Sequence, residues 1–237
     1  MSLKKLFIAL FLGGVLCLPS RAALIINELD SDSVNTPVTD AFEFVELYES
    51  SGTSVPLDGY VLVFYNGNGN VAYGAEDLDT FSTSATGYFT VGSIVTATKA
   101  RTANTIQNGV DAVALFLGSA TDFPNGTAAT ARPAGTTLID AVVYKTGADV
   151  DGVGLDTALL TGGPIVDEFG RDGQAATGAI DSIGRIPNGS GALLNTTSWT
   201  FMTPTPNAEN IAPIIPEPAS VLLLSIAGGI IGSRRRR

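Results

Sequence analysis

The chain contains no histidine in its 237 residues. Without an imidazole it has no Ser-His-Asp or Cys-His catalytic arrangement, no histidine general base and no histidine ligand for zinc. Its single cysteine, Cys17, lies in a segment interpreted below as a leader. The mature protein is therefore expected to have no disulfide, thiolate metal site or cysteine nucleophile. The chemistry left open is that of carboxylates, either paired for glycoside hydrolysis or bound to a metal ion.

Basic residues are scarce and lie mostly at the two ends of the chain. There are 13 Lys and Arg against 23 Asp and Glu, and seven of the basic residues fall within the first 21 or the last four positions. A chain that loses both ends but keeps Glu217 has six basic and 23 acidic residues, a net charge of −17. Such a surface repels nucleic acid and anionic lipid and attracts divalent cations. We therefore expect no nucleic-acid partner.

Long apolar patterns of helical period are missing from the body, apart from a one-turn candidate at 156–160. Short segments rich in β-branched and aromatic residues alternate instead with turns of Gly, Pro and Asn. The segments predicted to form strands are 24–29, 42–48, 59–65, 87–92, 111–117 and 138–144. Many short strands of this kind predict an all-β sandwich.

Two details refine the strand prediction. The segment 59–65 is the most apolar of the body and runs into 66–70, whose glycines and asparagines favour a hairpin turn, so we expect a central strand there. The sequences Asp-Ala-Val-Ala-Leu-Phe at 111–116 and Asp-Ala-Val-Val-Tyr at 140–144 resemble each other. We interpret them as two adjacent core strands and not as a repeat architecture.

The first 22 residues have the features of a secretory signal peptide. Lys4 and Lys5 precede an apolar stretch at 6–18, and the sequence Ser-Arg-Ala at 20–22 supplies small residues at the positions that signal peptidase reads. We place cleavage between Ala22 and Ala23. Signal peptidase is therefore the first expected partner, and the N-terminal segment is expected to be a signal helix.

The last 22 residues consist of three consecutive parts. They are Pro216, Glu217 and Pro218, an apolar stretch at 219–232, and a basic end formed by Arg234, Arg235, Arg236 and Arg237. Arginines stay on the cytoplasmic side of a membrane, so the protein ahead of them is expected to lie outside. Fourteen residues, from 219 to 232, are fewer than the roughly twenty that span a bilayer. We expect only a transient tether to the inner membrane.

In this three-part order the tail resembles the PEP-CTERM sorting signal of Gram-negative bacteria. The resemblance implies that an exosortase, a membrane-embedded cysteine transpeptidase, recognises Pro216, Glu217 and Pro218 and removes the tail during export. It also implies that the protein ends at the cell surface or outside the cell. An ordinary tail anchor that is never cut is the alternative. The chain thus divides into a signal peptide at 1–22, a domain at 23–210, and a linker with the sorting signal at 211–237.

The domain carries short motifs in a fixed order. They are Ile-Asn-Glu-Leu-Asp at 26–30, Glu-Phe-Val-Glu-Leu-Tyr at 43–48, Leu-Asp-Gly-Tyr at 57–60, Gly-Tyr-Phe at 87–89, Ser-Ile-Gly-Arg-Ile-Pro-Asn-Gly at 182–189, Trp199, and Thr-Pro-Asn-Ala-Glu-Asn at 205–210. In this order the chain resembles the bacterial secreted members of the lamin-tail-like family. The resemblance implies an immunoglobulin-like β-sandwich with an insertion at 145–179. Asn207 replaces the usual glycine of the closing turn, and asparagine also enters the left-handed region.

Two acidic clusters are candidate metal sites. Asp149, Asp151 and Asp156 surround two glycines, as in a calcium loop, although the spacing is not that of an EF-hand. Glu28, Asp30 and Asp32, followed by Asp40, project to one side of an extended segment, where a metal would relieve their repulsion. The competing interpretations are a solvated acidic loop for the first cluster and strand-end solubility for the second. Calcium is the only cofactor that we consider.

Four further positions draw attention. Glu43 and Glu46 differ in parity within one strand, so we expect them on opposite faces and not as a catalytic pair. Arg185 is one of few cations and is expected to pair with a buried carboxylate and hold a turn. Trp199 is expected in the sandwich core, with an exposed sugar-stacking role as the alternative.

These features predict an exported, non-enzymatic protein that binds or builds structure at the cell surface or in an extracellular polysaccharide matrix. The alternative is a carboxylate-dependent extracellular hydrolase of sugars or phosphate esters, or an accessory module to one. A calcium-stabilised structural module is a third possibility that overlaps with the first.

Overall fold

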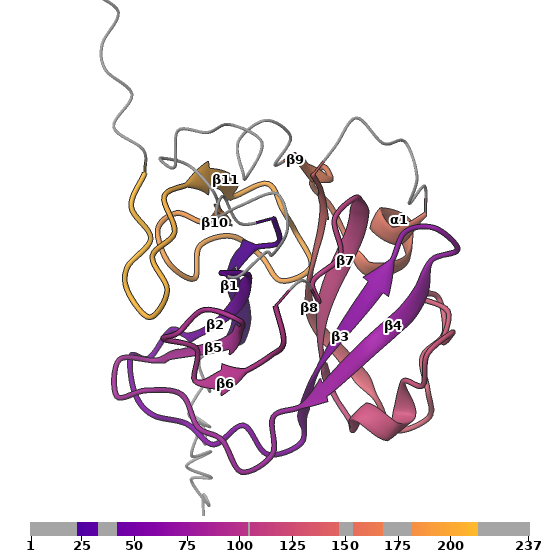
Figure 1. Ribbon diagram of the computed structural model, residues 1–237, viewed down its shortest axis with the longest axis horizontal. Helices are drawn as coiled ribbons and strands as arrows, with labels where there is room; N and C mark the ends of the chain where they lie inside the picture. The colour runs from indigo at the N-terminus through magenta and orange to yellow at the C-terminus, as the bar shows by residue number, and fades with distance from the viewer. Residues whose placement is uncertain (1–22, 33–41, 104, 147–153, 168–181, 213–237) are drawn as a thin grey trace, which may run out of the picture.

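The computed structural model describes residues 23–32, 42–103, 105–146, 154–167 and 182–212. This part of the chain is mostly β-sheet, and the two sheets stand side by side in Figure 1. The six-stranded sheet has the order β11-β10-β1-β2-β5-β6. Its strands are β1 (Leu24–Asp30), β2 (Phe44–Glu49), β5 (Tyr88–Gly92), β6 (Lys99–Ala100), β10 (Ser182–Arg185) and β11 (Trp199–Met202).

The five-stranded sheet has the order β4-β3-β7-β8-β9. Its strands are β3 (Tyr60–Asn66), β4 (Val71–Asp77), β7 (Val110–Leu117), β8 (Thr137–Lys145) and β9 (Val166–Asp167). Neighbouring strands are antiparallel in both sheets, except that β5 pairs with β6 and β8 with β9 in parallel. Two short helices, η1 (Ala120–Asp122) and α1 (Leu155–Leu159), lie in the connections of this sheet.

One hydrophobic core lies between the sheets, and both sheets supply it. The six-stranded sheet contributes alternate residues of β1, β2 and β5, and the five-stranded sheet contributes alternate residues of β3, β7 and β8. The central side chains are Ile26, Leu29, Leu47, Phe89, Leu62, Phe64, Leu115 and Tyr144, all fully buried. The described chain is therefore a sandwich of two sheets, and the expected all-β class is confirmed.

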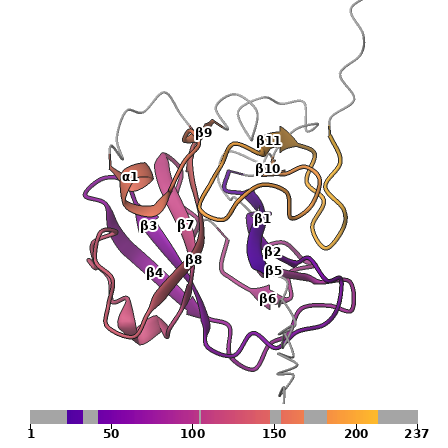
Figure 2. The ribbon, with the colours of Figure 1, turned by 180° about the vertical axis from the view of Figure 1, so that it is seen from behind.

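A second apolar layer covers the outer face of the five-stranded sheet. Val63 and Phe116 point away from the first core and pack with Phe123, which follows η1, and with Leu155 and Leu159 of α1. Figure 2 shows α1 on the far side of this sheet from β1 and β2. Because both faces of β3 and β7 are covered, these strands are nearly continuous apolar runs instead of alternating ones.

The six-stranded sheet has a β-bulge at Asn27. The register with β2 shifts between Ile26 and Glu28, so Asn27 is the extra residue on β1. Because of the extra residue, the alternation of inward and outward side chains along β1 shifts by one position after Asn27. Ile26 and Leu29 both enter the core, while Glu28 lies on the outer face of the sheet with Glu46, its Cα partner on β2.

Most sequence predictions of secondary structure are confirmed. All six predicted strand segments contain a strand, β3 and β4 form the predicted hairpin, and β7 and β8 are antiparallel neighbours. The one-turn helix appears as α1, within the segment that was predicted to be an insertion. Five strands were not among the predicted segments: β4, which the predicted hairpin turn implied, and β6, β9, β10 and β11, which nothing in the sequence analysis implied.

The predicted signal helix and sorting helix lie outside the described residues. Within the described ranges, no helix has both the length and the apolar character needed to cross a membrane.

Candidate functional site

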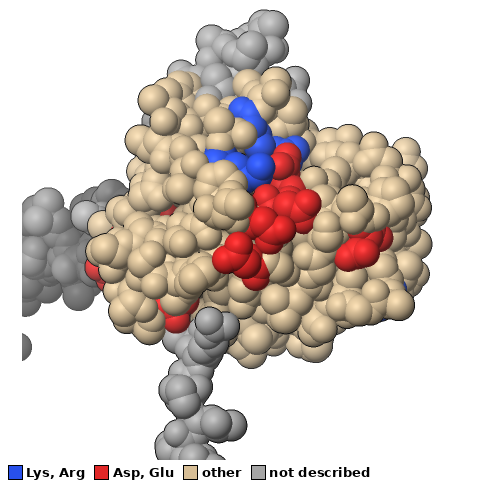
Figure 3. Space-filling model, turned by 90° about the horizontal axis from the view of Figure 1, so that it is seen from below, with Lys and Arg blue, Asp and Glu red and all other residues tan. Residues whose placement is uncertain are grey.

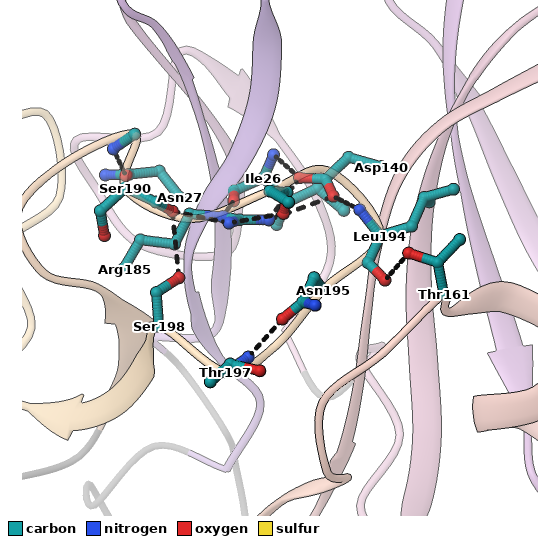
Figure 4. A network of polar contacts seen from close by, with 12 residues as sticks. Ile26, Asn27, Asp140, Thr161, Arg185, Ser190, Leu194, Asn195, Thr197 and Ser198 are labelled. Atoms are coloured by element: carbon teal, nitrogen blue, oxygen red, sulfur yellow. Dashed lines mark hydrogen bonds and ion pairs between the residues drawn. The ribbon is translucent and has the colours of Figure 1, made fainter.

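A buried ion pair joins the two sheets (Figure 4). Asp140 lies in β8 of the five-stranded sheet and Arg185 lies in β10 of the six-stranded sheet. The Nη2 atom of Arg185 donates to both carboxylate oxygens of Asp140, at 3.1 and 3.0 Å, and neither side chain has any exposed surface. A buried charge is tolerated only when it is paired and its remaining polar atoms are satisfied.

The remaining polar atoms of this pair bind backbone. Asp140 accepts hydrogen bonds from the N–H of Ile26 at 3.0 Å and of Leu194 at 2.8 Å. Arg185 donates from Nε to the carbonyl of Ile26 at 2.9 Å and from Nη1 to the carbonyl of Ser190 at 2.7 Å. The pair therefore fixes the loop between β10 and β11 to the centre of the sandwich.

The pair stays ionised because arginine keeps its proton in proteins. Burial raises the pKa of Asp140, while the guanidinium of Arg185 and the backbone donors of Leu194 and Ile26 oppose that rise. A neutral Asp140 would leave Arg185 as an unpaired buried charge. The expectation that Arg185 pairs with a buried carboxylate to hold a turn is confirmed.

Trp199 lies beside this pair. It is 8% exposed and belongs to the core between the sheets, and the guanidinium carbon of Arg185 lies 5.4 Å from the centroid of its ring. The core position predicted for Trp199 is confirmed, and the exposed sugar-stacking alternative is wrong because the side chain is buried in that core.

A second buried carboxyl site lies on the outer face of the six-stranded sheet. Glu28 and Glu46 are cross-strand partners, and both are 0% exposed. They are covered by residues 203–210, which we call the closing segment. The N–H of Thr205 donates to Glu28 at 2.9 Å, and the N–H of Asn207 donates to Glu46 at 2.6 Å. The φ angle of Asn207 is 64°, which confirms the left-handed conformation expected of it.

Asparagine side chains complete this site. Asn27, the bulge residue, donates to Glu46 at 2.9 Å and to Asn210 at 3.3 Å. Asn210 in turn donates from Nδ2 to the carbonyls of Asn27 at 3.2 Å and Arg185 at 3.0 Å. The bulge therefore turns an amide toward the carboxyl pair and ties β1 and β10 to the end of the closing segment.

The two carboxyl groups are hard to ionise. Burial raises the pKa of Glu28 to about 7, and burial together with the nearby charge of Glu28 raises the pKa of Glu46 to about 8. Hydrogen bonds from Ser182 and Thr205 to Glu28, and from Asn27 and Asn207 to Glu46, partly offset these rises.

The geometry around Thr205 supports a proton on Glu28. The hydroxyl oxygen of Thr205 lies 3.1 Å from Oε2 of Glu28 and 3.2 Å from Oδ1 of Asn210. A hydroxyl has one proton, so it cannot donate to two acceptors together. When Glu28 is protonated, its Oε2–H donates to the Thr205 hydroxyl, and that hydroxyl donates to Oδ1 of Asn210. Each of these three side-chain oxygens then has a hydrogen-bond partner.

The sequence analysis paired other acidic residues than the structure does. Glu43 lies before β2, and its Oε2 atom accepts from the N–H of Thr105 at 3.0 Å and of Ile106 at 3.2 Å. Glu43 and Glu46 therefore accept hydrogen bonds from different segments of the chain. They do not form a pair, as their odd spacing within one strand predicted. The pairing of Glu46 with Glu28 was missed, although the apolar spacing of Ile26 and Leu29 signals the bulge that brings it about.

The candidate metal sites have mixed outcomes. Strand-end solubility is a wrong account of Glu28, Asp30 and Asp32, because all three are buried, at 0%, 2% and 8% exposure. Asp40, Asp149 and Asp151 lie outside the described residues, and Asp156 lies in α1. Among the residues that the structure describes, no group of three or more acidic side chains is arranged to hold a metal ion.

Surface charges also bridge the sheets. Figure 3 shows a face of the molecule on which basic side chains lie directly beside acidic ones. Lys99 of β6 and Arg101 both pair with Glu76 of β4, at 3.0 and 2.8 Å. The Arg101 guanidinium also lies 4.1 Å from the centroid of the Phe64 ring. These contacts join the edges of the two sheets opposite the Asp140–Arg185 pair.

Comparison with known proteins gives no relative: no protein-family model, curated protein or solved structure matches this chain.

Proposed function

We propose that this chain is an exported, non-enzymatic protein of the cell surface or extracellular matrix, whose C-terminal tail is removed by an exosortase. The observation that carries the proposal is the position of the described sandwich in the sequence. β1 begins at Leu24, one residue after Ala23, and the last residue of the closing segment that is anchored by side-chain hydrogen bonds is Asn210, six positions before Pro216. The described sandwich thus lies within the interval between the two predicted processing sites.

The finer fold assignment is part of the same proposal. We assign the sandwich to the immunoglobulin-like, lamin-tail-like class. The motifs that suggested this class lie at structural positions of the sandwich: Arg185 and Trp199 lie at the inter-sheet ion pair, and Asn207 and Asn210 hold the closing segment. A domain of this kind acts by binding or by building structure, and an extracellular polysaccharide is the partner that we propose.

The roles of the buried carboxylates support a non-enzymatic protein. Asp140 neutralises Arg185, and Glu28 and Glu46 hold the closing segment. Each of these groups accepts hydrogen bonds from the backbone of its own chain. A catalytic acid or base must instead reach a substrate proton.

The test of the sorting proposal follows the mass and the location of the full chain in a host that contains an exosortase and in the same host without the enzyme. We expect loss of the tail only when the enzyme is present. Glu217→Ala should remain uncut, whereas Glu209→Ala, the same change at an exposed glutamate outside the motif, should be cut normally. A tail that stays uncut in the complete host would refute the proposal.

One observation favours the alternative of a carboxylate-dependent hydrolase. Glu28 and Glu46 are neighbouring carboxyl groups, and both pKa values lie near the range that suits a general acid. The closing segment covers them, so catalysis would need its displacement. Turnover of glycans or phosphate esters by the purified protein, lost in Glu46→Gln and kept in Glu209→Gln, would establish this function in place of the first.

A further inference from the structure

The chain contains five Asn-Gly pairs, at residues 66, 68, 108, 125 and 188. In such a pair the backbone nitrogen of glycine can attack the Cγ atom of asparagine, because glycine has no Cβ to hinder the approach. A C–N bond forms, the side-chain amide leaves as ammonia, and a five-membered imide results. Water then opens the imide to aspartate or isoaspartate. The attack requires a glycine N–H that is free to lose its proton.

Four of the five glycine N–H groups are hydrogen-bonded. Gly67 donates to Asp111 Oδ1 at 2.8 Å and Gly109 to Thr146 Oγ1 at 2.7 Å. The other two bonded donors and their acceptors are Gly126 with the carbonyl of Ala72, at 2.8 Å, and Gly189 with Asn27 Oδ1, at 3.0 Å. Attack at these sites must first break a hydrogen bond.

Two of the asparagine side chains are also held. Asn66 donates to Gln107 Oε1 at 2.6 Å, and Asn188 donates to the hydroxyl of Tyr88 at 2.7 Å. Asn188 also accepts from the N–H of Asn210 at 2.7 Å. These amides cannot turn toward the following nitrogen without losing their partners.

Asn68 and Gly69 differ from the other pairs. Both residues are exposed at the tip of the β3–β4 hairpin, and the described structure contains no hydrogen-bond acceptor for the Gly69 N–H. Among the described residues other than its two chain neighbours, Gly69 has a single atom within 4 Å of an added Cβ, Cγ2 of Val71 at 3.9 Å, so the turn is open there. The next residue is fixed, because Asn70 accepts from the N–H of Ala129 at 2.8 Å.

We propose that Asn68 is a site of spontaneous deamidation, which adds a carboxylate to the hairpin tip and leaves the sandwich intact. The modification needs only water and proceeds from the folded state. It does not depend on export or on the identity of a ligand. A molecule that persists in solution accumulates the product with time, so the hairpin records the age of the molecule.

The test incubates the purified full chain at mildly alkaline pH and follows all five asparagines by peptide mass spectrometry. We expect Asn68 to react at least about fivefold faster than each of the other four asparagines. A hydrogen bond of typical net strength reduces the fraction of glycine N–H groups that are free by about that factor. Asn68→Gln should abolish the fast modification. Equal rates at the five sites, or a faster rate at any other site, would overturn the proposal.

A second variant tests the protective role of the hydrogen bonds. Thr146→Val keeps the shape of a buried side chain but removes the acceptor of the Gly109 N–H. We expect the rate at Asn108 to rise toward that of Asn68, while Asn125 and Asn188 stay slow and thereby report an intact fold. An unchanged rate at Asn108 with an intact fold would contradict the mechanism. A rise in the deamidation rate at all sites would show that the variant unfolds. In that case the ranking of the five rates in the wild-type protein would decide whether the proposal holds.

Discussion

Asp140→Asn is expected to be among the most destabilising single substitutions in the sandwich. The change removes the charge that neutralises Arg185 and leaves the guanidinium buried without a counterion. Breaking one partner of a buried pair costs about 3–5 kcal/mol. Because the total stability of a domain is about 5–15 kcal/mol, this loss is a large fraction of it.

The hydrogen-bond geometry shows why asparagine is not a conservative replacement. Each Asp140 oxygen accepts from Arg185, and each also accepts from one backbone N–H, that of Leu194 or of Ile26. In either orientation of an asparagine amide, the NH₂ group therefore faces two donors. The expected cost is at the upper end of the range, and the thermal midpoint should fall by roughly 10–20 °C for a domain of this size.

The assay is thermal and denaturant unfolding of the wild type and of Asp140→Asn, with an exposed ion pair as the matched control. Lys145 and Asp167 pair at 3.2 Å but are 33% and 52% exposed, so Lys145→Met should cost less than about 1 kcal/mol. If Asp140→Asn were no more destabilising than Lys145→Met, the inter-sheet ion pair would not hold the sandwich as argued.

A double substitution isolates the interaction itself. Asp140→Leu combined with Arg185→Met removes both charges, so neither is left unpaired. Replacing a whole buried pair is less costly than breaking it. The double variant should therefore be more stable than the sum of the two single losses by about 2 kcal/mol or more. Additive losses would refute a direct coupling between the two side chains.

Three further predictions concern the closing segment, the sheet and the metal. In the folded protein the pKa values of Glu28 and Glu46 are about 7 and about 8, above the ordinary 4.5, so protonation of these groups favours the folded state. Their contribution to the free energy of unfolding should therefore be complete below about pH 4.5 and should be lost as the pH rises to about 8. Glu46→Gln should flatten this slope in unfolding measured against pH, and an unchanged slope would argue against it. Gly92→Ala should prevent folding, because its Cβ would lie 2.2 Å from a carbonyl oxygen, whereas Gly74→Ala, whose nearest neighbour is 3.9 Å away, should be tolerated when soluble yield and circular dichroism are compared. If the segment containing Asp149, Asp151 and Asp156 is a calcium loop, calcium should raise the thermal midpoint of the full chain, and Asp151→Asn should abolish that rise. Equal midpoints in calcium and in chelator would rule out the calcium interpretation of this segment.

The strands were predictable from the sequence where their pattern is local. Segments such as 59–65 and 111–117 are apolar, β-branched or aromatic and end in turn residues, and they form β3 and β7. The likeness of 111–116 to 140–144 correctly indicated neighbours, because both strands face the same two apolar layers. β6 and β9 were not predictable. Each has only two residues, and each exists because it adds in parallel to a strand that is already formed.

The candidate sites depend on contacts that no local pattern encodes. Arg185 was expected to have a carboxylate partner, but Asp140 lies 45 residues earlier and in the other sheet. Its position inside the apolar stretch 138–144 is the one available signal, since a lone charge in a core strand must be paired. The Glu28–Glu46 pair needed both the bulge at Asn27 and the return of the closing segment. The bulge can be inferred from the spacing of the apolar residues in β1, whereas the return of the closing segment over the carboxyl pair cannot be inferred from any local pattern.

Acidic side chains perform inside this protein a task that disulfides perform in many small secreted domains. Several of them accept hydrogen bonds from backbone N–H groups of distant segments and so fix long connections. These acceptors, with the residue whose N–H they bind, are Asp77 with Ala120, Asp111 with Gly67, Asp140 with Leu194, Glu43 with Thr105, Glu28 with Thr205, and Glu46 with Asn207. The excess of acidic residues is therefore partly a property of the interior and not only of the surface.

This distinction changes the expected charge of the molecule. A glutamate whose pKa is about 8 is about nine-tenths protonated at pH 7, so Glu46 adds almost nothing to the negative charge. Glu46→Gln should then leave the electrophoretic mobility of the folded protein at pH 7 nearly unchanged, while Glu209→Gln, at an exposed position, should shift it by a full charge. At about pH 9 and above, where Glu46 is at least about nine-tenths ionised, both variants should shift nearly alike. Equal shifts at pH 7 would mean that Glu46 is ionised beneath the closing segment, and the segment would then have to be held against the repulsion of two buried charges.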